Sequence, residues 1–265
     1  MTLPIYVVDA FASEAFKGNP AGVCPLDSAL GEETMQSIAM EMNHAETAFP
    51  LRRADGDWDL RWFTPACEVD LCGHATLASA HILWSTGRAE GALRFHTRSG
   101  VLTAAQVGDQ IELDFPSERA DPLALDVTEV LDSEPVWFGK NRMDYLAELP
   151  SEQAVLAFAP KLDKIRALGM RGLIVTARSS SGEYDFVSRF FGPNAGVDED
   201  SVTGSAHCCL GPYWALRLGR NSLVGYQASR RGGFVGVEVD GDRVRLRGRA
   251  VTVVAGVLDS SIGGT

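Results

Sequence analysis

The chain has 265 residues, an apolar content of 45% and a formal net charge of −11. This length fits one large domain or two of roughly 130 residues each, and the acidic balance argues against nucleic acid as a partner. No apolar run approaches the ~18 uncharged residues that a membrane span requires, and the N-terminus MTLPIYVVDAF lacks the basic start of a signal peptide. The five cysteines form no CxxC pair, which argues against a disulfide framework and a zinc site. We therefore expect a reduced, cytoplasmic protein with no membrane partner and no bound metal.

The first half of the chain alternates short strands with two helices. Met35, Ile38, Ala39 and Met42 recur at helical spacing and predict a helix over residues 32–42. A second helix is expected to begin at Gly73, and because its residues are mostly small or apolar it should be buried. The remaining apolar runs are separated by turn residues, as antiparallel strands are. The expected strands are 5–11, 21–26, 45–51, 60–63, 92–96, 101–107 and 111–115.

The second half follows the same order of elements. Ser151 is an N-cap candidate for a helix predicted over residues 151–168, with Glu152 in its first turn. A further helix, again of small and apolar residues, is predicted over 204–218. The expected strands are 136–138, 145–149, 172–177 and 184–191, with more strands toward the end of the chain.

One motif occurs in both halves. RWFTP at 61–65 and RFFGP at 189–193 share an Arg, an aromatic residue, Phe and Pro in the same order. Each is followed by a Gly that leads an apolar helix, within CGHAT at 72–76 and TGSAH at 203–207. The loop before that Gly is longer by three residues in the second copy. Two copies with matching neighbours indicate a duplicated half.

The duplication predicts two lobes. The polar, Pro-bounded segment SERADP places a linker near residues 116–122. We therefore expect residues 1–116 to form the N-terminal lobe, to which the C-terminal strand could return, and residues 117–265 to form the C-terminal lobe. Lobes related by a pseudo-twofold axis would present equivalent loops to one ligand in a cleft.

The two Gly-led helix starts suit an anionic ligand. A helix N-terminus exposes unpaired backbone N–H groups and the positive end of the helix dipole, which favour a carboxylate. Gly73 and Gly204 allow the backbone to approach the ligand closely, and Cys72 and Thr203 precede them at matching positions. These four residues are the candidates for substrate binding. The arrangement suits proton transfer at a carbon beside a carboxylate.

Four stretches, DAFASEAFKGNPAGV, ETAF, RWFTPACEVDLCGHATLASAH and SRFFGPNAGVDEDSVTGSAHCCLGPYW, carry a family resemblance. The chain resembles the phenazine-biosynthesis-like (PhzF-like) isomerases, which have the diaminopimelate-epimerase-like fold. The resemblance implies an α+β protein of two pseudo-symmetric lobes, each a curved, mostly antiparallel sheet or barrel around a central helix. It also implies a homodimer, and an active site between the lobes that isomerises a small carboxylate substrate by proton transfer without a cofactor.

The resemblance also nominates the catalytic residues. Glu46, in ETAF, matches the family's proton-shuttling Glu, and burial in a cleft should raise its pKa toward neutrality. The point that matches Glu46 in the other half, near Ile174, is apolar. His74 is expected to protonate the substrate or bind its oxygen. Asp200 and Ser205, from the DxxTGS element, are expected to orient or share a proton and to bind the substrate.

The sequence departs from the family pattern at two positions. Ala45 stands where the family commonly has Ser, which puts one substrate hydrogen bond in doubt. Ser201 replaces the usual Pro, so the loop should be less rigid. Asp198 and Glu199 in the same loop are interpreted as solvated charges.

Three other classes of function compete with the isomerase: a cysteine-dependent epimerase, a non-catalytic ligand-binding paralogue and a nucleotide-dependent enzyme. Racemases and epimerases of this fold use two Cys as opposed bases, and here Cys72 is matched by Thr203, which is too weak an acid and base. A one-thiol epimerase that combines Cys72 with Glu46 remains open, although free Cys is most often a small buried packing residue. A non-catalytic ligand-binding paralogue would not need Glu46 as a base. The sequence contains no P-loop and no dinucleotide-binding glycine pattern, so a nucleotide-dependent enzyme is disfavoured.

Overall fold

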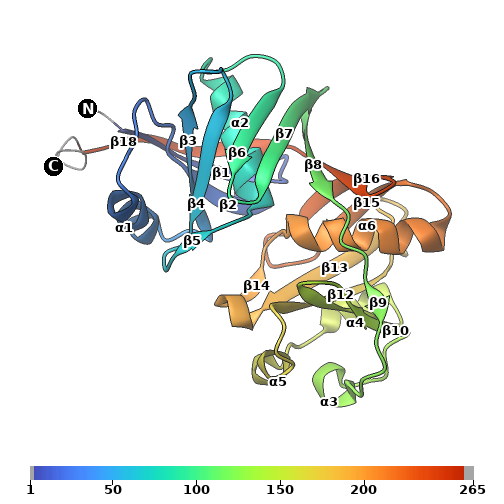
Figure 1. Ribbon diagram of the computed structural model, residues 1–265. Helices are drawn as coiled ribbons and strands as arrows, with labels where there is room; N and C mark the ends of the chain where they lie inside the picture. Colours follow the sequence, from blue (N-terminus) through green and yellow to red (C-terminus); the bar gives the residue numbers. More distant parts are fainter. Residues whose placement is uncertain (1–2, 260–265) are drawn as a thin grey trace. The chain divides into compact units, whose positions relative to one another are not determined.

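The computed structural model describes residues 3–259, and the chain divides into two compact units. Unit 1 is Met1–Asp114 together with Arg247–Thr265, and unit 2 is Phe115–Leu246. The last strand, β18 (Ala250–Leu258), pairs antiparallel with the first, β1 (Leu3–Ala10), and so completes the sheet of unit 1. Figure 1 shows the two strands side by side.

Unit 1 consists of a mixed sheet and two helices. Its central helix α2 (Gly73–Ser85) packs on β1, β2, β3 and β18. Most of its side chains are buried, as an apolar surface on all sides predicts. The bounds of the other elements are β2 Asn19–Val23, α1 Glu32–Met42, β3 Glu46–Arg52, β4 Trp58–Phe63, β5 Glu68–Val69, β6 Leu93–Thr97, β7 Gly100–Val107 and β8 Gln110–Pro116.

Unit 2 is built in the same way around helix α6 (Gly204–Leu218), which packs on β15 and β16. The other elements are β9 Asp121–Pro122, α3 Thr128–Leu131, β10 Trp137–Lys140, β11 Asp144–Glu148, α4 Glu152–Ala157, α5 Leu162–Ala167, β12 Gly172–Arg178, β13 Phe186–Gly192, the 3-10 turn η1 Pro193–Ala195, β14 Val197–Asp200, β15 Ser222–Gln227, β16 Gly233–Asp240 and β17 Arg243–Gly248. The fold class is therefore α+β, as expected.

The strand pairings confirm the duplication. In unit 1 the pairs β1–β2, β2–β3, β3–β4, β4–β6 and β6–β7 are in turn antiparallel, parallel, antiparallel, parallel and antiparallel. In unit 2 the pairs β10–β11, β11–β12, β12–β13, β13–β15 and β15–β16 follow the same series. Both units therefore have the same topology, and each sheet is mixed.

The repeated Arg motif makes the same contacts in both units. Arg61 binds the Glu68 carboxylate through Nε at 2.7 Å and Nη2 at 2.6 Å, and its guanidinium lies over the Phe63 ring. Arg189 binds Glu199 in the same way, at 2.7 and 3.1 Å, over the Phe191 ring. The interpretation of Glu199 as a solvated loop charge was therefore wrong, because Glu199 lies in β14 and its carboxylate binds Arg189 of β13.

The single helix predicted over residues 151–168 was also wrong. The segment forms two short helices, α4 and α5, with extended backbone at Phe158. Pro160 lies between them. Proline lacks the N–H that a helix interior needs and disfavours helical geometry in the residue before it. The N-cap prediction was right, since the Ser151 hydroxyl accepts a hydrogen bond from the Ala154 N–H.

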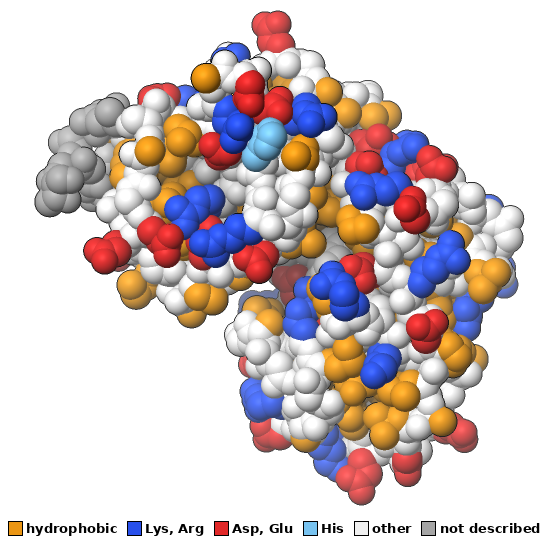
Figure 2. Space-filling view, viewed as in Figure 1, with side chains coloured by type: hydrophobic (Ala, Val, Ile, Leu, Met, Phe, Trp, Pro, Cys, Tyr) orange, Lys and Arg blue, Asp and Glu red, His pale blue; other side chains and the backbone are white. Residues whose placement is uncertain are grey.

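Surface charge is dispersed. On the face that Figure 2 shows, acidic and basic side chains of the described residues lie interleaved. Many of them form exposed ion pairs, such as Arg53 with Asp59 at 2.7 Å. Among residues 3–259, no helix is long and apolar enough to cross a membrane.

Two of the three leucines of α6, Leu210 and Leu216, provide a test of the core. Leu210 is fully buried and Leu216 is 83% exposed on the same helix. Leu210→Ala should lower the free energy of unfolding by about 2–5 kcal/mol, because it leaves a cavity. Leu216→Ala should stay within about 0.5 kcal/mol of the parent chain. Urea denaturation followed by circular dichroism measures both, and equal losses would contradict this placement of α6.

Candidate active site

Glu46, Cys72 and His74 meet in unit 1 where a strand and a helix begin. Glu46 is the first residue of β3, and α2 begins at Gly73. Glu46 Oε2 lies 3.1 Å from His74 Nε2, and the Cys72 Sγ lies 3.6 Å from His74 Nδ1. The Asn19 side-chain amide contacts His74 Nδ1 at 3.2 Å from the start of β2. Of the predicted site residues, the structure therefore brings Glu46, Cys72, Gly73 and His74 together.

Glu46 and His74 each favour the charged form of the other. Burial raises the pKa of Glu46, but the positive charge of His74 and the close polar contacts with His74 and Cys72 outweigh it, so the net pKa is lowered. Burial lowers the pKa of His74, but Cys72 and Glu46 together raise it well above 6.5. The expected raised pKa of Glu46 was therefore wrong, because the expectation considered burial without the imidazolium beside it.

A charged His74 has two N–H donors. Nε2 faces Glu46 and Nδ1 faces the Asn19 amide. A half-turn of that amide presents its oxygen to Nδ1–H, which fixes the orientation of the ring. Asn19 is thus a positioning residue.

Glu46 Oε2 is poised to accept a proton. Within the described part of the chain this buried oxygen has no hydrogen-bond partner, because its 3.1 Å contact with His74 is close but not aligned as a hydrogen bond. A buried carboxylate oxygen without a partner is costly unless a ligand supplies one. This oxygen can take a proton from a substrate carbon, while His74 can donate one.

Cys72 is a neutral thiol at pH 7. Burial, followed by the negative charge of Glu46, raises the pKa of this thiol to about 11. The thiolate is the reactive form of cysteine, so Cys72 is poorly suited to act as a base. At the equivalent place in unit 2, Thr203 offers no thiol.

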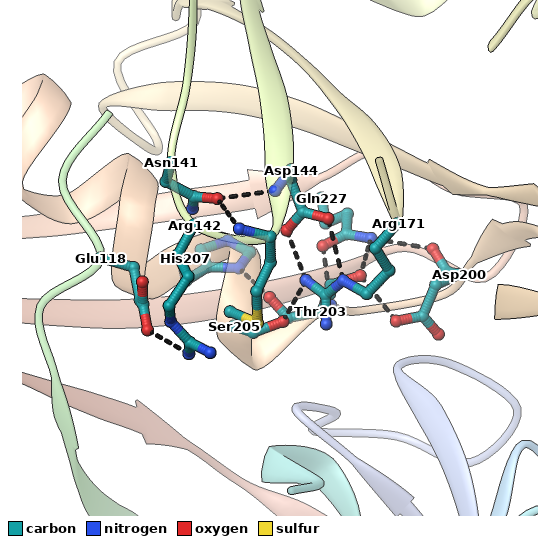
Figure 3. A network of polar contacts seen from close by, with 11 residues as sticks. Glu118, Asn141, Arg142, Asp144, Arg171, Asp200, Thr203, Ser205, His207 and Gln227 are labelled. Atoms are coloured by element: carbon teal, nitrogen blue, oxygen red, sulfur yellow. Dashed lines mark hydrogen bonds and ion pairs between the residues drawn. The ribbon is translucent and has the colours of Figure 1, made fainter. Parts of the chain in front are cut away.

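In unit 2, the start of α6 carries a second group of polar residues (Figure 3). The Thr203 hydroxyl donates to Asp200 Oδ2 at 2.6 Å. Gln227, at the end of β15, accepts from the Thr203 N–H at 2.8 Å and donates to the Asp200 carbonyl at 2.8 Å. Gln227 is fully buried. It therefore holds the loop from Asp200 to Gly204 in place.

Ser205 belongs to the same group and is held by Arg171. Arg171 Nη2 donates to the Ser205 hydroxyl oxygen at 2.9 Å, and Arg171 Nε donates to Asp144 Oδ1 at 2.8 Å (Figure 3). Asp144 is fully buried. Because the Ser205 oxygen accepts a hydrogen bond from Arg171, the hydroxyl hydrogen points away from Arg171 and can be donated to an anion.

The strand register shows how the two groups correspond. Thr47 pairs with Phe63 in unit 1, and Leu173 pairs with Phe191 in unit 2. The counterpart of Glu46 is therefore Gly172, and not the Ile174 region expected from the sequence. Arg171 directly precedes Gly172 in the chain. Unit 2 therefore has a cation next to the position at which unit 1 has the carboxylate of Glu46.

The sequence reasoning missed three residues of these two groups. Asn19, Arg171 and Gln227 were not predicted as site residues, although Asn19 lies in one of the stretches that carry the family resemblance. A polar residue at the end of an apolar strand, such as Gln227 in SLVGYQ, was the one available signal. Asp200, Thr203, Gly204 and Ser205 do lie together in unit 2, as predicted.

Comparison with known proteins identifies the family. The family model described as "Phenazine biosynthesis-like protein" (PhzC-PhzF) matches residues 8–256. An uncharacterized isomerase of Halalkalibacterium halodurans is 53% identical over 259 residues, covering 96% of this chain and 97% of the relative. A crystal structure of a PhzF-family phenazine biosynthesis protein from Enterococcus faecalis matches with a TM-score of 0.92 and 41% identity, covering 98% of this chain and all of that one.

A more distant structure extends the likeness in fold alone. A predicted epimerase of Pseudomonas aeruginosa has a TM-score of 0.70 at 22% identity, with 97% of this chain and 99% of that one covered. The family model and the relatives above 40% identity span almost the whole chain. This chain therefore belongs to the phenazine biosynthesis-like, PhzC-PhzF protein family.

Proposed function

We propose that the protein is a cofactor-independent isomerase that transfers a proton on a small carboxylate substrate, with Glu46 as the base. The names of its relatives, among them an uncharacterized isomerase 53% identical to it, support the isomerase class. The observation that carries the proposal is the buried Glu46 oxygen without a hydrogen-bond partner, held 3.1 Å from His74.

The pair can both remove and return a proton. Glu46 Oε2 takes a proton from a carbon beside the substrate carboxylate, and the electron pair of the broken C–H bond is delocalised onto the substrate. His74, a cation beside the base, stabilises that negative charge, either as a hydrogen-bond donor or by lending its Nε2 proton to a substrate oxygen and taking it back when Glu46 protonates the second carbon. The proton on Glu46 then goes to a second carbon, so the substrate is isomerised with no net gain or loss of atoms.

The residues at the start of α6 are suited to bind a carboxylate. The Ser205 hydroxyl, whose oxygen accepts from Arg171, can donate its hydrogen to a carboxylate oxygen. The N-terminus of α6 adds the positive end of a 15-residue helix. Asp200 acts through Thr203, which it holds by a hydrogen bond.

We also infer that the protein is a cytoplasmic homodimer. All five cysteines are free thiols, and four of them are buried, which suits a reducing compartment. A non-catalytic ligand-binding paralogue is less consistent with the relatives of this chain, three of which are named isomerases.

The first prediction concerns the base. Glu46→Gln keeps the shape of the side chain but removes its basicity, so solvent deuterium uptake into a turned-over substrate should fall roughly 100- to 10,000-fold while ligand binding largely remains. Proton NMR in D₂O with a panel of cyclic and linear carboxylic acids measures the exchange. Glu41→Gln, on the exposed side of α1, is the matched control and should exchange at the parent rate. Full exchange in Glu46→Gln would remove Glu46 from this role.

The second prediction concerns pH. The proposed active form has Glu46 ionised and His74 protonated. Because the pKa of Glu46 is lowered from 4.5 and that of His74 is raised well above 6.5, kcat/KM should fall only below pH 4.5 and well above pH 6.5. In His74→Asn the cation is lost and only Cys72 still opposes the effect of burial on Glu46, so the acid limb should move upward. A pH–rate profile tests this, and an unmoved acid limb would contradict the coupling.

The third prediction concerns the hydroxyl. Ser205→Ala removes a charge-assisted hydrogen bond to the substrate, which is worth about 1.5–3 kcal/mol, so kcat/KM should fall roughly 10- to 150-fold. Ser201→Ala, in the same loop, is the control and should keep the parent value. Steady-state kinetics of both variants distinguishes them, and a Ser205→Ala enzyme with unchanged kcat/KM would argue against Ser205 as a substrate ligand.

A further inference from the structure

The Glu46 site also has the composition of a metal site. Glu46, Cys72 and His74 each offer one ligand atom, and these atoms all lie within 4.8 Å of one another. A carboxylate oxygen, a thiolate sulfur and an imidazole nitrogen are ligands that Zn²⁺ accepts together. The proposed proton transfer uses Glu46 and His74 but gives no role to the Cys72 sulfur.

We propose that Glu46, Cys72 and His74 form a binding site for a thiophilic divalent cation of the Zn²⁺ type, and that the bound ion switches the isomerase off. The ion is an inhibitor of the site rather than a cofactor of the reaction. Its binding does not depend on the proposed function, whereas the inhibitory consequence rests on it.

The distances fit one ion bound through His74 Nε2. Bond lengths of about 2.0–2.2 Å to N and O and about 2.3 Å to S, in tetrahedral geometry, give ligand spacings of about 3.4 Å for N···O and about 3.6 Å for N···S. The observed spacings from His74 Nε2 are 3.1 Å to Glu46 Oε2 and 3.9 Å to Cys72 Sγ. Shifts of a few tenths of an ångström in the side chains would close the site.

Burial gives a second, independent reason. Cys72 and His74 are each only 5% exposed, and Glu46 Oε2 is a buried oxygen without a hydrogen-bond partner among the described residues. A buried polar atom without a partner is typical of a position at which a ligand or an ion binds. A cation satisfies it and forms bonds to all three side chains at once.

The surroundings prepare the imidazole for this role. A metal-bound histidine usually keeps the hydrogen of its other ring nitrogen in a hydrogen bond that orients the ring. The Asn19 amide lies against Nδ1 at 3.2 Å, which leaves Nε2 on the side of Glu46. The ion replaces the Nε2 proton and the Cys72 thiol proton, and both protons pass to solvent.

Three protein ligands leave a fourth position for water or a substrate oxygen. An ion bound to these three side chains would occupy both the lone pair of Glu46 Oε2 and the Nε2 of His74, which proton transfer needs. Isomerisation therefore stops while the ion is bound.

A second group of possible ligands serves as a comparison. Asp55, Asp57 and His96 also lie within ligand distance of one another, at the surface of unit 1. This group has no sulfur. Asp57 is already held by Arg94 at 3.2 Å and by His96 at 2.7 Å. It is expected to bind a thiophilic ion only weakly.

Cobalt is the direct probe, because a thiolate bound to Co²⁺ gives a near-ultraviolet charge-transfer band. Titration of the full chain with Co²⁺, and with Zn²⁺ in calorimetry, should show one site per chain and that band. Cys72→Ser should abolish the band and weaken Zn²⁺ binding more than about 100-fold, beyond the roughly 10- to 100-fold that loss of a residue behind a ligand costs.

Two control variants make the outcome specific. Cys67→Ser removes the exposed thiol of the same unit, and His96→Asn removes the imidazole of the comparison group. Both should keep the band and the Zn²⁺ affinity of the parent chain. Absence of the band in the parent chain, its persistence in Cys72→Ser or its loss in Cys67→Ser would overturn the site.

The inhibition of deuterium exchange by Zn²⁺ is measured in a separate experiment. Zn²⁺ should stop deuterium exchange in the parent chain and in Cys67→Ser over the concentration range in which calorimetry shows binding. Exchange that continues with the ion bound would overturn the regulatory part. If no substrate exchanges at all, the proposed function fails, whereas the spectroscopic result on the metal site stands independently.

Discussion

The chemistry proposed for this protein depends on the contact between Glu46 and His74. This contact places a carboxylate and an imidazolium 3.1 Å apart in a largely buried site, so each group keeps the other charged. Burial alone would have neutralised both. In a buried site such a pairing allows a base to stay ionised beside an acid that stays protonated. The start of β3 and the start of α2 hold the two side chains together.

The same juxtaposition of a strand start and a helix start occurs in both units, with different side chains. In unit 1 it carries Glu46 and His74, and in unit 2 it carries Arg171 and Ser205. The surrounding scaffold has changed little, because the Arg–Glu clamp and the order of strand pairing are the same in both. Duplication therefore supplied two equivalent positions, which then diverged into one suited to move protons and one suited to hold anions.

Local patterns predicted most of the fold. The bounds of α1 and α6 follow from apolar spacing, from Gly204 at the start of α6 and from Gly219 after its end. The helix over 151–168 failed because Pro160 was given too little weight. The family resemblance allowed the clustering of Glu46 with Cys72 and His74 to be predicted. It did not predict the direction of the pKa shift of Glu46, because that shift depends on His74, 28 positions away along the chain. Arg171 and Gln227 were missed for a related reason, because their roles come from tertiary contacts that no short pattern encodes.

The return of β18 to β1 has a consequence for biosynthesis. Unit 2 is an insertion within unit 1, so a ribosome releases all of unit 2 before the strand that closes the first sheet emerges. The inserted unit can fold while translation continues. The edge of β1 that pairs with β18 keeps its backbone groups unpaired until β18 has been synthesised. The sheet that carries Glu46 is thus completed only after all of unit 2 has been synthesised.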